Sequence, residues 1–97
     1  MTKNISSAGV ADGESHFISP GANRIHYITA GKGSRTIVFV HCWAGNLGFW
    51  REQVPAFADK ARLIFIDLPG HGQSDKPQTA YTVDFFANAV LAVLRDA

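Results

Sequence analysis

Two short apolar runs dominate the hydrophobic pattern of the chain. Residues 37–40 (IVFV) and 63–66 (LIFI) contain no polar alternation, which is typical of strands covered on both faces, as in a parallel sheet. The intervening segment, Leu47 to Lys60, is long enough for a crossover helix, so the pattern predicts a βαβ unit. Because Pro55 interrupts the helical spacing of that segment, we expect two short helical pieces there.

A hairpin is predicted ahead of this unit. His16–Ser19 and Ile25–Thr29 flank the turn-forming residues 20–23 (PGAN), which favours an antiparallel pair. In the second strand Ile25, Tyr27 and Thr29 share one face.

A helix is predicted at the carboxyl-terminal end of the sequence. Thr82 can cap it, and Asp84 falls in its first turn, where a negative charge is favourable. One apolar stripe follows helical spacing: Phe85, Phe86, Ala89, Val90, Val93 and Leu94.

Two stretches lack periodic structure. Residues 1–14 are rich in small and polar residues and are expected to form a flexible leader, so that residues 15–97 make up the folded part. Residues 68–77 (LPGHGQSDKP) contain too much Gly and Pro for a regular element and predict a long loop after the second buried strand. Ligand sites in parallel sheets lie at the carboxyl ends of the strands, and this loop and residues 41–46 both fall there.

Composition narrows the classes of partner. A net charge of +1 with scattered Lys and Arg favours no nucleic-acid partner. The amino terminus lacks the apolar core of a signal peptide, and no window has the length of a membrane span, so a cytoplasmic location without membrane contact is expected. The single cysteine, Cys42, excludes an internal disulfide, zinc-type spacing is absent, and we expect no metal or other cofactor.

Three motifs carry a family resemblance. Residues 37–43 (IVFVHCW), 49–51 (FWR) and 67–75 (DLPGHGQSD) resemble the first part of an α/β-hydrolase, and the order of elements is similar from about His16 to the last residue. The resemblance implies an α/β fold: the front part of the hydrolase sheet, with a hairpin, a βαβ unit with a Gly-rich loop, and a final helix.

The resemblance also implies that essential parts are missing. Similar hydrolases continue with a Gly-x-Ser-x-Gly nucleophile elbow and later supply the acid and histidine of the triad. Gly-x-Ser-x-Gly occurs nowhere in the 97 residues. We therefore expect an amino-terminal fragment of a serine-type hydrolase acting on a small-molecule carboxylic ester or related acyl substrate, truncated before the elbow and inactive alone.

The resemblance assigns roles to five residues. Trp43 occupies the position whose backbone N–H supplies half of the oxyanion hole in similar hydrolases. His41 matches a strand-end histidine that organises the loops, and Asp67, Ser74 and Asp75 are expected to brace the Gly-rich loop, the two aspartates by accepting backbone N–H bonds.

Other polar residues are interpreted without a catalytic task. Cys42 stands where the family usually has Gly, and a Cys42–His41 dyad is disfavoured because adjacent strand residues point to opposite faces. His71 is expected to be a solvated loop residue, and His16 and His26 are expected to lie on the surface of the hairpin.

Several functional alternatives stay open. The motifs are similar to those of small carboxylesterases of the acyl-carrier-protein methyl ester type. Epoxide hydrolases usually carry Pro where Ala44 stands, and many haloalkane dehalogenases use Asn where Trp43 stands, but relatives of either kind remain alternatives. A further hypothesis is a non-enzymatic chain that completes its sheet with a partner, because a bare apolar strand edge promotes pairing and self-association. An incomplete gene product without a role is the last alternative.

Overall fold

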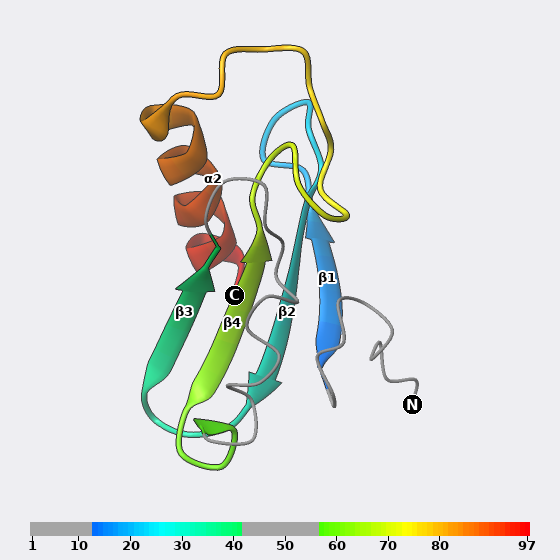
Figure 1. Cartoon of the computed structure of the whole chain (residues 1–97). Coiled ribbons are helices and arrows are strands. Elements are labelled where there is room, and N and C mark those ends of the chain that lie inside the picture. Colours follow the sequence, from blue (N-terminus) through cyan, green and yellow to red (C-terminus); the bar gives the residue numbers. More distant parts are fainter. Residues whose placement is uncertain (1–12, 42–56) are drawn as a thin grey trace.

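A computed structural model describes residues 13–41 and 57–97 of the chain. In this part a four-stranded mixed sheet and a helix form the fold (Figure 1). The elements are β1 (Glu14–Ile18), β2 (Ile25–Gly31), β3 (Thr36–Val40), β4 (Arg62–Asp67) and α2 (Val83–Asp96).

The sheet has the order β1-β2-β4-β3. The β1–β2 and β2–β4 pairs are antiparallel, whereas β3 and β4 run parallel. The predicted hairpin and the predicted parallel pair are therefore confirmed, with strand ends that differ by one or two residues. The helical pieces expected around Pro55 lie largely outside the described residues.

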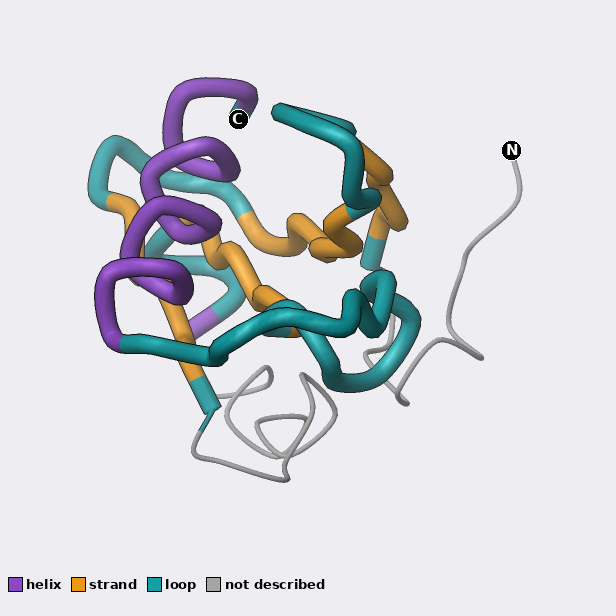
Figure 2. The backbone as a smooth tube through the Cα atoms, turned by 90° about the horizontal axis from the view of Figure 1, so that it is seen from above, coloured by secondary structure: helices purple, strands orange, loops and turns teal. Residues whose placement is uncertain are grey.

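One face of the sheet packs against α2 (Figure 2). The alternation predicted for β2 holds, since Ile25 and Tyr27 both lie on this face. Burial of such side chains contributes about 1.5–3 kcal/mol each and holds α2 on the sheet. The buried residues here are Ile25, Tyr27, Ile64, Ile66, Leu68, Ala89 and Val93.

The opposite face carries a second apolar cluster. Leu63 and Phe65 of β4 have no exposed surface, and the Phe65 ring stacks on Phe39 of β3 with ring centroids 4.8 Å apart. Side chains of β4 are thus buried on both faces, as the unbroken apolar run predicts.

The helix begins as its sequence predicts but buries a narrower stripe. The Thr82 hydroxyl accepts a hydrogen bond from the Phe85 N–H at 3.1 Å, and Asp84 lies in the first turn. Ala89 and Val93 are buried, while Leu94 is 42% exposed. Leu94 belongs to the predicted apolar stripe but not to the buried contact with the sheet, which is centred on Ala89 and Val93.

No helix within residues 13–41 and 57–97 combines the length and the apolar character needed to cross a membrane.

Candidate functional site

The carboxyl ends of β3 and β4 are joined by a side chain. His41, directly after β3, is 3% exposed, and its Nε2 accepts a hydrogen bond from the Leu68 N–H at 3.1 Å. This bond fixes the start of the 68–77 loop relative to the end of β3. Since neutral imidazole has one acceptor nitrogen, the bond also requires that any proton on neutral His41 sits on Nδ1.

Asp67, at the end of β4, is buried and accepts hydrogen bonds from two elements. Its Oδ2 lies 2.9 Å from His26 Nδ1 of β2 and accepts the Gln73 N–H at 3.1 Å. His26 and Asp67 face one another in the β2–β4 register, so the sheet itself brings them together. Bonds to a charged acceptor are stronger than neutral ones, which makes Asp67 the centre of this end of the sheet.

A glycine makes room for the Asp67 carboxylate. Gly72 has a φ of +51°, and a Cβ at this position would lie 2.3 Å from Asp67 Oδ1. The loop can return over Asp67 only with glycine at this point.

Ser74 connects the loop to two strands. It is 2% exposed, its hydroxyl donates to the Asp67 carbonyl at 2.6 Å, and the same oxygen accepts the His26 N–H at 2.8 Å. A buried hydroxyl with both functions satisfied contributes to a rigid loop.

Asp75 connects the loop to the hairpin. Its Oδ2 accepts the Arg24 N–H at 2.8 Å, and its own N–H donates to the Arg24 carbonyl at 2.8 Å. The Asp75 and Arg24 side chains are half exposed, so their ion pair at 4.0 Å adds little. The hydrogen bonds made by Asp75 therefore join segments that are distant in the chain.

Two histidines differ from their predicted environment. His26 has no exposed surface and His71 is only 7% exposed, so the expectations of a surface and a solvated residue are wrong. His26 lies beneath Phe17, with ring centroids 4.7 Å apart. The His71 Nδ1–H donates a hydrogen bond to the Pro69 carbonyl at 3.0 Å, and the centroids of the His71 and His41 rings lie 4.9 Å apart. A signal for His26 was present, since strand alternation places it on the same face as Ile28.

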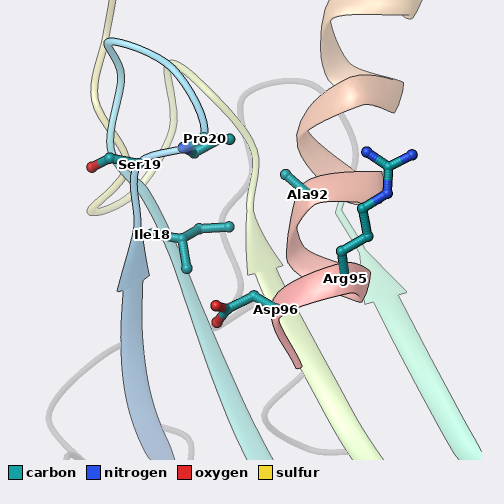
Figure 3. A pocket seen from close by; sticks show the side chains of 6 residues that line it. All are labelled: Ile18, Ser19, Pro20, Ala92, Arg95 and Asp96. Atoms are coloured by element: carbon teal, nitrogen blue, oxygen red, sulfur yellow. The ribbon is translucent and has the colours of Figure 1, made fainter.

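A hollow of about 480 Å³ lies on the α2 side of the sheet (Figure 3). The end of β1 and the last turns of α2 form it, and the Asp96 carboxylate projects toward the strands. Tyr27 donates its phenol hydrogen to Asp96 Oδ2. Burial, then the hydrogen bond and the charge of Asp96, raise the pKa of Tyr27 to about 12.

The expected oxyanion residue Trp43 and its neighbour Cys42 lie outside the described residues. Within residues 13–41 and 57–97, no three His, Cys, Asp or Glu side chains come together as metal ligands.

Comparison with protein families gives one match over most of the chain. Residues 35–97 match the family described as alpha/beta hydrolase fold.

Individual proteins are also similar to this chain. The pimeloyl-[acyl-carrier protein] methyl ester esterase of Edwardsiella ictaluri is 39% identical over 64 residues, which are 66% of this chain and 24% of that protein. A soluble epoxide hydrolase of Corynebacterium sp. is 41% identical over 58 residues, 60% of this chain and 20% of that protein.

Among solved structures, Est816, described as an N-acyl homoserine lactone degrading enzyme, superposes with a TM-score of 0.78 at 37% identity, covering 84% of this chain and 31% of that one. The chain thus spans between a fifth and a third of the length of these relatives.

Proposed function

The chain belongs to the α/β-hydrolase fold family, and from this premise we propose that it supplies the amino-terminal part of a serine-type hydrolase of carboxylic esters or related acyl compounds. The esterase and lactone-degrading relatives support the substrate class. Two observations support a nucleophile supplied by a later segment. The chain covers only 24% of the esterase relative, and Gly-x-Ser-x-Gly is absent from its 97 residues.

One observation carries this proposal: the bond between His41 and the Leu68 N–H. It ties together the carboxyl ends of the parallel strands β3 and β4, the edge of the sheet at which such folds bind ligands. The 68–77 loop is thus fixed at its start to the end of β3, and a fixed loop at this edge can position a substrate better than a free one.

In the proposed mechanism the Trp43 backbone N–H is one of two oxyanion donors. It follows His41 by two residues, so the position of His41 sets where the donor-bearing loop starts. Such a donor lowers the barrier because it is oriented before negative charge develops on the substrate oxygen. The second donor belongs to the residue after the nucleophile, in the later segment.

Asp67, Ser74 and Asp75 act on this site through the backbone. Asp67 and Ser74 hold the 68–77 loop against β2, and Asp75 holds it against Arg24. We assign these three residues a positioning role rather than a chemical one, since their polar atoms are engaged with the protein itself.

The test uses the complete enzyme that contains this segment. Trp43→Pro removes the backbone donor, whereas Trp43→Ala retains it and serves as the matched control. We expect kcat for a p-nitrophenyl ester to fall about 10²–10³-fold in Trp43→Pro and much less in Trp43→Ala. Equal effects of the two substitutions would refute the donor assignment.

A second test uses the isolated 97 residues, which lack the Gly-x-Ser-x-Gly elbow. They are expected to hydrolyse the same ester no faster than their Cys42→Ala and His41→Ala variants. A rate above both variants would show that Cys42 or His41 supplies catalysis within the segment and would overturn this part of the proposal.

A second candidate is epoxide opening, which the identity to the soluble epoxide hydrolase favours. The two candidates differ in the nucleophile, Ser or Asp, at the elbow of the later segment. Assays of the complete protein with styrene oxide and with a p-nitrophenyl ester separate them, since each substrate reports one reaction.

The edge of the sheet favours the remaining alternative, a chain that pairs with a partner. Within the described residues β3 pairs only with β4, and Val40 of β3 is 41% exposed. An apolar edge strand is a template for another strand, including that of a second copy. Size-exclusion chromatography of the 97 residues over a range of concentrations measures this self-association.

A further inference from the structure

Ser15, His26 and Asp67 form a row across three strands. The Ser15 hydroxyl lies 2.5 Å from His26 Nε2, and His26 Nδ1 lies 2.9 Å from Asp67 Oδ2. The row follows from the sheet register, because His26 faces Asp67 directly and lies diagonally from Ser15 in β1. These are the contacts that a serine nucleophile, its base and the orienting acid make in hydrolytic enzymes.

The direction of hydrogen bonding follows from the donor inventory. A carboxylate only accepts, so His26 Nδ1 carries the hydrogen of the bond to Asp67. In the neutral ring Nε2 is then the acceptor, and the Ser15 hydroxyl donates to it. This is the tautomer in which a histidine can withdraw the proton of a serine.

The base is held rigidly and the serine is accessible. His26 has no exposed surface, the Phe17 ring packs on it, and its backbone N–H is bonded to Ser74. Ser15 is partly exposed and lies on β1, the outer strand of the described sheet. The His26 ring therefore cannot leave the row easily, whereas Ser15 retains part of its exposed surface.

We propose that Ser15 is a nucleophile activated by His26, oriented by Asp67, that accepts an acyl or phosphonyl group from small activated esters. The Ser15 oxygen forms a bond to the carbonyl carbon while its proton passes to His26 Nε2. The bond to the leaving oxygen breaks as that oxygen takes the proton from His26, and Asp67 stabilises the imidazolium between the two steps. Water then restores Ser15 and releases the acid by the same proton route.

This reactivity is separate from the proposed oxyanion function of Trp43. Its residues lie on β1, β2 and β4 and are present in this chain, whereas the nucleophile of the proposed hydrolase belongs to a later segment. Failure of either proposal therefore leaves the other standing.

The test is a competition between two serines of the same peptide. A fluorophosphonate reacts with serine by loss of fluoride, which departs with the serine proton. Cleavage after Lys3 and Arg24 yields one peptide, residues 4–24, that contains Ser6, Ser7, Ser15 and the exposed Ser19, and fragmentation assigns the label among these four serines. A nucleophilic serine at an elbow would be labelled on a different peptide.

We expect Ser15 of the native protein to react at least about 100-fold faster than Ser19, the lower range of general-base assistance. In about 8 M urea, which unfolds a small domain, the labelling rates of Ser15 and Ser19 should become similar. Equal labelling of both serines in the native protein, or no label on Ser15, overturns the proposal without any variant.

Variants test the relay. His26→Gln should remove the advantage of Ser15 over Ser19, whereas Asp67→Asn should reduce it by changing the tautomer. ¹⁵N chemical shifts of the His26 ring report the tautomer directly, with hydrogen on Nδ1 in the wild type and on Nε2 in Asp67→Asn. An unchanged tautomer and unchanged Ser15 labelling in folded Asp67→Asn would exclude the positioning role of Asp67.

Discussion

Gly72→Ala gives the sharpest test of how the 68–77 loop is held. The substitution places a Cβ where the structure has only 2.3 Å between that position and Asp67 Oδ1, at a φ of +51°. Two consequences follow: the backbone at this residue becomes strained, and the carboxylate must move. Movement of the carboxylate weakens its bonds to His26 and to the Gln73 N–H.

Both consequences lower the free energy of unfolding. A left-handed conformation costs an L-residue about 1–2 kcal/mol. Each hydrogen bond to a charged group contributes about 1.5–3 kcal/mol. Strain together with the loss of one bond gives a decrease of about 2.5–5 kcal/mol in the free energy of unfolding, and the loss of both bonds gives about 4–8 kcal/mol.

The matched control is Gly21→Ala in the β1–β2 turn. A Cβ there would meet no atom within 4 Å, and its φ lies outside the left-handed range. Reduced freedom of the unfolded chain should make this variant neutral or about 0.4–1 kcal/mol more stable. Urea unfolding followed by circular dichroism measures both variants.

The expected difference between the two variants corresponds to a fall in Tm of more than about 10 °C for a domain of this size. A typical substitution changes the free energy of unfolding by about 1 kcal/mol. If the free energies of unfolding of Gly72→Ala and Gly21→Ala differ by no more than this, the contact between Gly72 and Asp67 does not hold the loop.

Three further outcomes are expected. Thr82→Ala should lower the free energy of unfolding by about 1 kcal/mol through loss of the helix cap, while Thr79→Ala, in the preceding loop, should have little effect. The raised pKa of Tyr27 favours the protonated phenol in the fold, so its stabilisation is complete below pH 10 and is lost as the pH rises toward 12; Tyr27→Phe should remove this part of the alkaline decrease in Tm, and an identical decrease would contradict the assignment. Val40→Lys places a charge on the exposed β3 edge and should lower the apparent mass of the 97 residues in size-exclusion chromatography, whereas no change in concentrated samples would exclude association through this edge.

Local patterns were sufficient to predict most elements. The unbroken apolar runs at residues 37–40 and 63–66 predict the parallel pair, and Thr82 with its following stripe predicts α2. These features depend on residues close in the sequence, where periodicity and capping act directly. The family resemblance likewise rests on short motifs, and the match over residues 35–97 agrees with it.

The environment of the polar residues was decided by tertiary structure. His26 was expected on the surface, yet it lies between Ser15, Phe17 and Asp67, and the last of these is 41 residues away in the chain. A polar residue in a strand can be buried only if distant segments satisfy its hydrogen bonds. The residues next to His26 in the sequence do not indicate which distant residues these partners are.

The same contrast holds for the loop after β4. Its Gly and Pro content by itself determined that residues 68–77 form no regular element. Only the register of β2 against β4 decided that Asp67 meets His26, and only the return of the loop at Gly72 decided that Ser74 reaches the backbone of β2. Composition limits the conformations open to a segment, whereas its position depends on long-range hydrogen bonds that form once the sheet is assembled.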